Sequence, residues 1–153
     1  MTISVMLNGE RRELAARSDE MLLEVLRRAG LRSVRLSCGV GVCGSCTCLL
    51  DGQPVSTCLL LAPLADGAVL ETVEGLAVDD PVQRAFDELC AYQCGYCTPG
   101  MILTARHLLA DDPSPSSDRI REHLNGNTCR CGCYPRIEAA VARAARTPSE
   151  ETT

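Results

Sequence analysis

Four cysteines in the first half of the chain have the spacing of an iron–sulfur site. Cys38, Cys43 and Cys46 form a C-x4-C-x2-C run, and Cys58 follows it. Plant-type ferredoxins hold one [2Fe–2S] cluster with this spacing. The glycines of the run let the backbone wrap closely around a cluster and aim N–H groups at its sulfurs. Zinc or buried structural cysteines are the alternatives, but zinc ligands usually come as two separated pairs.

A second set of cysteines lies farther along the chain. Cys94 and Cys97 form a C-x2-C pair, and Cys129 and Cys131 form a C-x-C pair after a long gap. Taken alone, these pairs suit a zinc site as readily as an iron–sulfur cluster. Both are expected in turns just before helices, where free N–H groups favour thiolates and an anionic cluster. Cys133 extends the later pair and is an alternative ligand, although we favour Cys129 and Cys131.

Other candidate residues carry weaker signals. Cys48 and Cys90 are interpreted as small buried hydrophobic residues, because a reactive cysteine needs an exposed, electropositive setting. His107 and His123 lie on expected helices away from the cysteines, which favours solvent or core roles and excludes a Rieske-type histidine pair. Arg130 lies between two cysteines, and the sequence leaves open whether it faces solvent, a cofactor or a partner.

The elements around the first cysteine set predict a small mixed sheet packed on one helix. Alternating apolar residues that run into Asn-Gly or Asp-Gly indicate hairpins. Apolar residues at helical spacing indicate one helix, with Ser18 or Asp19 as its cap. This is an α+β order. The expected elements are a hairpin turning at Asn8-Gly9, a helix over 19–29, a hairpin turning at Asp51-Gly52 and a strand over 69–73.

From about residue 75 the hydrophobic period changes to that of helices. Four helical stretches follow, and each is preceded by a capping residue or begins with a first-turn proline. We therefore expect a domain over 1–75, a helical domain over 76–146 and a disordered tail over 147–153. The expected helices span 81–92, 98–110, 117–125 and 135–146.

Length, charge and hydropathy narrow the class of protein. The 153 residues suit one average domain or two small ones, whose thin cores would need a metal or another staple. A net charge of −5 argues against a nucleic-acid-binding face. No apolar run approaches the ~20 residues of a membrane span, and the first residues lack the order of a signal peptide. We expect a cytoplasmic protein whose reduced cysteines bind metal.

Three segments together resemble the iron–sulfur subunit of the molybdenum hydroxylase, or xanthine oxidase, family. They are the run from Cys38 to Cys58, the motif Gln93-Cys-Gly-Tyr-Cys-Thr-Pro-Gly100 and the motif Gly126-Asn-Thr-Cys-Arg-Cys131. The resemblance covers residues 2–146. It implies an N-terminal ferredoxin-like β-grasp domain with the outer cluster, followed by a C-terminal four-helix bundle with the inner cluster.

The resemblance also implies a function, partners and ligands. The chain would be the electron-transfer subunit of a molybdenum-containing hydroxylase or dehydrogenase, carrying electrons singly from molybdopterin to FAD or another acceptor. A large molybdopterin-binding subunit and a medium FAD-binding subunit would be its partners, in a dimer of heterotrimers. Gln93 and Cys131 would lie beside the pterin. The implied ligands are Cys38, Cys43, Cys46 and Cys58 for the [2Fe–2S] cluster nearer the flavin, and Cys94, Cys97, Cys129 and Cys131 for the one nearer molybdenum.

A few positions depart from the usual pattern of that family. Ser37 replaces a glycine, Gly39 replaces an acidic residue, and Cys133 stands where the family has glycine. None of these changes removes a ligand, but altered polarity near the sulfurs can shift a cluster's potential. Two other functions stay open: a freely diffusing two-cluster ferredoxin and a zinc-stabilised interaction module. The sequence contains no nucleotide-binding motif, so nothing in it indicates a site for an organic substrate.

Overall fold

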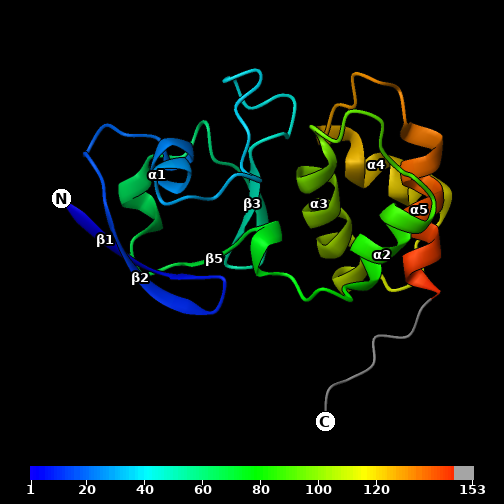
Figure 1. The fold of residues 1–153 in the computed structure, drawn as a ribbon, viewed down its shortest axis with the longest axis horizontal. Helices are drawn as coiled ribbons and strands as arrows, with labels where there is room; N and C mark the ends of the chain where they lie inside the picture. The colour runs from blue at the N-terminus through cyan, green and yellow to red at the C-terminus, as the bar shows by residue number, and fades with distance from the viewer. Residues whose placement is uncertain (147–153) are drawn as a thin grey trace, which may run out of the picture.

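The computed structural model describes residues 1–146, and the predicted disordered tail over 147–153 lies outside the described residues. A five-stranded mixed sheet forms the N-terminal half, and a bundle of α-helices forms the C-terminal half (Figure 1). This arrangement confirms the predicted α+β fold class. None of the helices within residues 1–146 is long and apolar enough to cross a membrane.

The sheet consists of the strands β1 (Thr2–Leu7), β2 (Glu10–Ala15), β3 (Thr47–Leu50), β4 (Gln53–Ser56) and β5 (Val69–Glu71). Strand β1 pairs antiparallel with β2 and parallel with β5, and β3 pairs antiparallel with β4 and β5. Asn8 and Gly9, with φ angles of 51° and 82°, form the predicted tight turn between β1 and β2. Asp51 and Gly52, at 49° and 80°, form the corresponding turn between β3 and β4.

Helix α1 (Leu22–Arg28) packs against the sheet through its apolar face. No side chain caps this helix, so the predicted caps Ser18 and Asp19 are wrong. The N–H group of Leu22 donates instead to the carbonyl of Leu60 at 2.7 Å, while Asp19 forms an ion pair with Arg17. The chain that follows β4 therefore satisfies the start of α1 in place of a local cap.

The helical half contains α2 (Pro81–Glu88), α3 (Thr98–Asp111), α4 (Ser117–His123) and α5 (Tyr134–Ala145). All the predicted helices are present, although their ends differ. Asp80 caps α2 by accepting hydrogen bonds from the N–H groups of Val82 and Gln83, both at 3.0 Å. Helix α2 ends earlier than predicted, and Cys90 beyond it has a φ of 45°. The cap of α4 is Ser116.

Each half has its own hydrophobic core. The core of the sheet half lies between β1, α1 and the short helix over Ala62–Ala65. The core of the helical half lies between α2, α3, α4 and α5, around Phe86 and Met101. Because the chain has no Trp and one Phe, aliphatic side chains fill most of both cores. Both cysteine-rich loops extend from the same end of the two halves (Figure 1).

Candidate iron–sulfur centres

The first cysteine set lies on two segments that the sheet holds together. Cys38, Cys43 and Cys46 lie on the loop between α1 and β3, and Cys58 lies just beyond β4. Because β3 and β4 form a hairpin, the residues before β3 and after β4 come close together. Side-chain hydrogen bonds join Cys38 to Cys43 and Cys46 to Cys58. The structure thus brings together all the residues predicted for the first cluster.

Backbone N–H groups surround the sulfur of Cys38. The N–H group of Val40 donates to this sulfur at 3.4 Å. Hydrogen bonds from the N–H groups of Val40, Cys43 and Val42, together with the Cys43 thiol, lower the pKa of Cys38 to about 6. Gly41, with a φ of 73°, allows the tight path of the loop. Donors that stabilise a thiolate here also suit the sulfurs of an anionic cluster.

The other pair of the first set is shielded from solvent. Cys46 is 3% exposed and Cys58 is 7% exposed. Burial and the hydrogen bond with Cys46 raise the pKa of Cys58. The first site therefore has an open side at Cys38 and a closed side toward the sheet.

The second cysteine set joins two loops of the helical half. Cys94 and Cys97 lie between α2 and α3, while Cys129 and Cys131 lie between α4 and α5. Side-chain hydrogen bonds join Cys94 to Cys131 and Cys97 to Cys129. As predicted, both loops lead into helices, because Cys97 directly precedes α3 and Cys133 directly precedes α5.

The thiols of the second set also divide into an open and a buried pair. Hydrogen bonds from the N–H group of Tyr96 and from the Cys131 side chain lower the pKa of Cys94. Burial and the hydrogen bond with Cys129 raise the pKa of Cys97 to about 12. Cys94 and Cys131 are exposed, and Cys129 is buried. This second site therefore repeats the layout of the first.

Cys133, the alternative ligand, contacts Cys129 from the helical core. Its side chain is 3% exposed and packs in the helical core. The N–H group of Cys133 donates to the sulfur of Cys129 at 3.4 Å. The guanidinium of Arg136 donates to the sulfur of Cys133 at 3.8 Å. Burial and the hydrogen bond with the Cys129 side chain raise the pKa of Cys133. This placement favours Cys129 and Cys131 over Cys133 as the later pair.

The predicted ligands of each site lie as two hydrogen-bonded pairs, and at the second site Cys133 adds a further thiol beside Cys129. A [2Fe–2S] cluster needs two ligands on each of its two irons, whereas structural zinc gathers four ligands around one ion. Within residues 1–146, no group of three or more Cys, His, Asp or Glu side chains is placed to hold a single metal ion. The paired thiols fit binuclear clusters better than zinc.

Two predictions about isolated cysteines have opposite outcomes. Cys48 is fully buried in the sheet core, and burial raises its pKa to about 12, which confirms its interpretation as a small core residue. Cys90 is exposed, so its predicted burial is wrong. Helix α2 ends before Cys90, and the left-handed backbone there turns the chain away from the core face.

The two histidines, which the sequence treats as separate residues, form a pair. His107 Nδ1 and His123 Nε2 lie 3.0 Å apart, with their ring centroids 5.1 Å apart. Burial and the neighbouring His107 lower the pKa of His123. They lie on α3 and α4, and no sequence motif relates them. Their hydrogen bond gives them a packing role between two helices.

Sequence analysis also missed a buried asparagine between the two cysteine loops. Asn127 is 6% exposed and hydrogen bonds to Gly44 and Thr104. It precedes Cys129 within the motif that carries the family resemblance. Its position next to the later cysteines could have marked it as a candidate site residue. Its hydrogen-bond partners could not be predicted, because they lie far away in the sequence.

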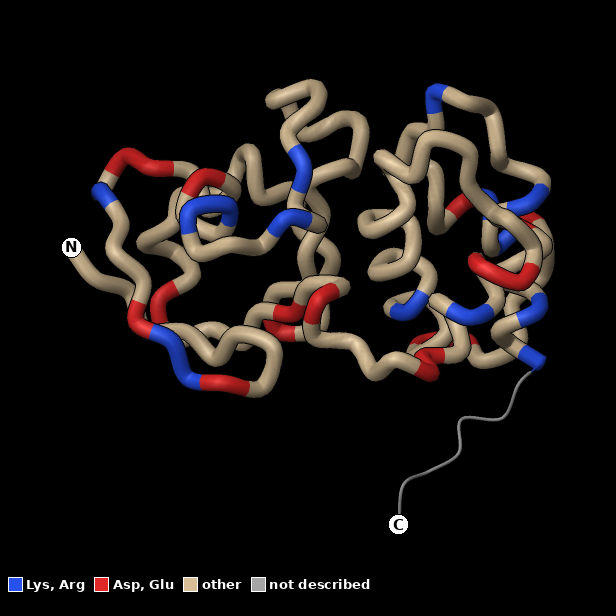
Figure 2. The backbone as a smooth tube through the Cα atoms, in the orientation of Figure 1, with Lys and Arg blue, Asp and Glu red and all other residues tan. Residues whose placement is uncertain are grey.

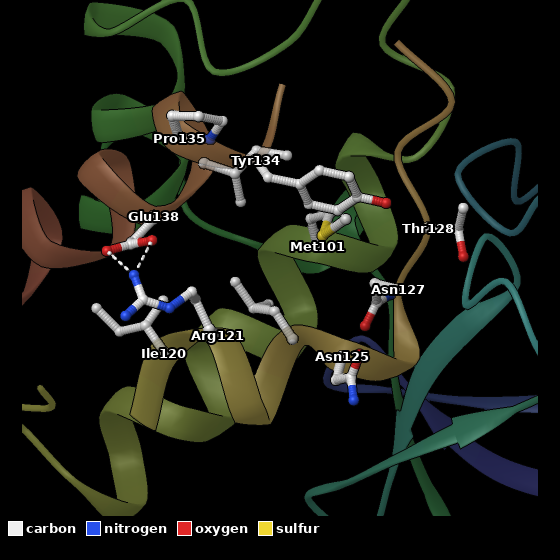
Figure 3. Close-up of a pocket in the computed structure, with 11 residues that line it drawn as sticks. Met101, Ile120, Arg121, Asn125, Asn127, Thr128, Tyr134, Pro135 and Glu138 are labelled. Atoms are coloured by element: carbon white, nitrogen blue, oxygen red, sulfur yellow. Dashed lines mark hydrogen bonds and ion pairs between the residues drawn. The ribbon is translucent and has the colours of Figure 1, made fainter. Parts of the chain in front are cut away.

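A pocket of about 480 Å³ opens beside the second cysteine set. Figure 3 shows its wall, in which Arg121 on α4 reaches both carboxylate oxygens of Glu138 on α5 at 3.0 Å. The ring of Tyr134 crosses the pocket, and its hydroxyl accepts a hydrogen bond from the N–H group of Cys129 at 2.8 Å. The pocket wall is therefore tied to the backbone of the cysteine loop.

Comparison with known proteins relates both halves of the chain to iron–sulfur domains. Residues 5–77 match the 2Fe-2S iron-sulfur cluster binding domain, and residues 72–142 match the [2Fe-2S] binding domain. The nicotinate dehydrogenase small FeS subunit of Eubacterium barkeri is 46% identical over 145 residues, which are 92% of each chain.

Solved structures agree with these matches. A chain of quinoline 2-oxidoreductase from Pseudomonas putida 86 aligns with a TM-score of 0.89 and 44% identity, over 95% of this chain and 96% of that chain. The aldehyde oxidoreductase from Desulfovibrio desulfuricans aligns with a TM-score of 0.89 and 38% identity, over 94% of this chain but 17% of that longer one. The chain therefore belongs to the iron–sulfur subunit family of the molybdenum hydroxylases, as the electron-transfer subunit of an oxidoreductase with two [2Fe–2S] clusters.

Proposed function

We propose that each cysteine set holds one of the two [2Fe–2S] clusters. The observation that supports this assignment is the pairing of thiols at both sites, with backbone N–H groups directed at the sulfurs. When bound, each cluster accepts and releases one electron at a time. The proposed ligands are Cys38, Cys43, Cys46 and Cys58 for the first cluster, and Cys94, Cys97, Cys129 and Cys131 for the second.

The proposed path of electrons runs from the helical half to the sheet half. Electrons enter from molybdopterin in a large partner subunit, and they leave from the first site to FAD in a medium subunit or to another acceptor. Gln93 and Cys131 are exposed, which suits residues that lie beside a pterin held by another chain. The role of this chain is to bury, space and tune the clusters.

The surface around the cysteine loops favours a docked subunit over a diffusing ferredoxin. No charged residue occurs in residues 36–50 or 89–105. Figure 2 shows both cysteine loops at the top of the view with few charges, while most acidic and basic residues lie elsewhere. Val40, Val42 and Leu59 are 63%, 67% and 59% exposed beside the first site. Exposed apolar surface of this kind marks a site of protein contact. We call this surface, over the segments 36–46 and 93–100, the uncharged edge.

The chain's relatives are small subunits of larger oxidoreductases, and we propose a dimer of heterotrimers as its own assembly. The separate cores support domains over 1–75 and 76–146. We also place the protein in the cytoplasm, where its many thiols would stay reduced until they bind iron.

The assignment can be tested by comparing neighbouring cysteines in the complex purified without air. Reduction of the unchanged protein with dithionite should give two S = ½ EPR signals and about four irons per chain. Cys131→Ser should remove or strongly change one signal, because its thiol belongs to an open pair. Cys133→Ser should keep both signals, because Cys133 is not one of the proposed ligands. Zinc in the second site, or the opposite response of these two variants, would overturn the second ligand set.

A further inference from the structure

One backbone hydrogen bond joins the two proposed cluster sites. The N–H group of Thr128 donates to the carbonyl of Cys43 at 2.9 Å. Cys43 belongs to the first ligand set, and Thr128 directly precedes Cys129 of the second set. This bond therefore starts on a ligand residue of one site and ends beside a ligand residue of the other.

A second contact between the loops follows a longer chemical route. Arg35 donates to the carbonyls of Gly95 and Tyr96 at 2.5 and 2.9 Å, and the Tyr96 hydroxyl donates to the carbonyl of Leu36 at 2.5 Å. These bonds involve long side chains, and none of their partners is a proposed ligand. They fasten the loops together without linking the ligands as directly as Thr128 does.

Asn127 holds the Thr128 contact in place. Its side chain is buried, with Nδ2 donating to the carbonyl of Gly44 at 3.2 Å and Oδ1 accepting from the Thr104 hydroxyl at 3.0 Å. The Gly44 carbonyl can only accept a hydrogen bond, so the amide must present its nitrogen on that side. Asn127 thereby fixes the segment before Cys129 against the residue that follows Cys43.

The two halves approach so closely here that no side chain fits between them. A Cβ atom on Gly100, at the start of α3, would collide with the backbone carbonyl of Gly44. A Cβ atom on Gly44 would collide with the side chain of Asn127 and the carbonyl of Gly126. Backbone therefore packs on backbone, and the distance between the loops is set by these contacts.

We infer that electrons pass between the clusters through the hydrogen bond from Thr128 N–H to the Cys43 carbonyl, with Asn127 as the positioning residue that holds it. In this step the second cluster is oxidised by one electron and the first is reduced by one electron, with no proton moved and no covalent bond broken. The inference rests on the ligand sets of the proposed function.

The hydrogen bond can be removed without removing a side-chain contact of Asn127. Thr128→Pro deletes the N–H donor, and the extended backbone of Asn127, at φ −120° and ψ 120°, is one that a residue before proline adopts. Thr128→Ala is the matched control, because it shortens the side chain but keeps the N–H group. In the complex we expect Thr128→Pro to slow electron exchange between the clusters several-fold and Thr128→Ala to leave it unchanged. Freeze-quench EPR after rapid reduction would follow each cluster separately.

Asn127 supplies an independent test through the magnetic interaction between the two reduced clusters. Asn127→Ala removes both side-chain bonds, so we expect a changed spin–spin splitting in the EPR spectrum together with slower exchange. Asn125→Ala is the control, since Asn125 is an exposed asparagine in the same segment. Should Thr128→Pro fail to fold, an unchanged splitting and rate in Asn127→Ala would still overturn the inference.

The outcomes separate this inference from the proposed function. If the unchanged protein gave fewer than two cluster signals in EPR, the ligand sets themselves would be overturned. Two intact signals with equal exchange rates in Thr128→Pro and Thr128→Ala would leave the ligand sets standing and overturn the inferred path. Slower exchange in Thr128→Pro with an unchanged splitting would support the path, because the distance between the clusters would then be the same.

Discussion

Burial distinguishes residues that look alike in the sequence. Cys46 and Cys48 are both buried, yet Cys46 pairs with another thiol whereas Cys48 packs only in the core. Cys131 is exposed beside the second site, but nearby Cys133 is turned into the helical core. In the first case Cys48 lies within β3, whereas Cys46 precedes that strand on the loop that carries Cys38 and Cys43. In the second case Gly132, at a φ of 72°, turns the chain between the two thiols.

At the residue scale, Glu20 should contribute to the loss of folding stability at acidic pH. Two hydrogen bonds from Arg28 and one from the Arg17 N–H group lower the pKa of Glu20 from 4.5 to about 2. The unfolded chain therefore binds the proton first, so this contribution to stability is complete above pH 4.5 and is lost as the pH falls toward about 2. We expect Glu20→Gln to flatten that part of the pH dependence of urea unfolding. Glu24→Gln, at an exposed position, should retain the slope of the unchanged protein.

The ion pair of the buried Asp80, at the start of α2, should contribute more to the free energy of unfolding than the exposed residue before it. Asp80 is 5% exposed, caps α2 and also forms an ion pair with Arg106 of α3. Asp80→Ala removes the cap and leaves Arg106 without this partner, so we expect a loss of about 3 kcal/mol in unfolding free energy. Asp79→Ala, at the exposed preceding residue, should change it by less than about 0.5 kcal/mol. Chemical denaturation of both variants would measure the difference, and equal losses would contradict this role.

At the element scale, the start of α3 must approach the first cysteine loop closely. Gly100→Ala places a methyl group against the Gly44 carbonyl, so we expect a loss of about 1–3 kcal/mol in stability. Gly126→Ala is the matched control, because a Cβ atom there meets nothing within 4 Å. Thermal unfolding and iron content would report both effects. If both variants matched the unchanged protein, the close packing of α3 on the loop would not be needed.

Local chemistry explains which elements could be predicted from the sequence. The turns at Asn8-Gly9 and Asp51-Gly52 depend on neighbouring residues alone, and both are confirmed. The start of α1 depends on the carbonyl of Leu60, which lies far along the chain, so sequence reasoning chose a wrong cap. In the same way the cysteine sets could be predicted from spacing. The pairing of Cys94 with Cys131 and of Cys97 with Cys129 could not, because each pair joins two different loops.

At the scale of the whole molecule, the uncharged edge should be needed for assembly. Val42 is 67% exposed there, next to a proposed ligand of the first cluster. We expect Val42→Glu to reduce the amount of partner subunits that copurify with the chain, since a docked surface would bury the new charge without a partner. Val78→Glu is the control, because Val78 is fully exposed on the segment that joins the two halves. Equal recovery of the complex with both variants would place the partner elsewhere.

The exposed thiols of Cys38, Cys94 and Cys131 give the maturation of this subunit an order. A protein that delivers iron and sulfide must reach these thiols from the side of the uncharged edge. A partner docked on that edge, as we propose, would close this approach. We therefore expect the clusters to be inserted before assembly, and the docked partner then to shield them from oxygen and chelators.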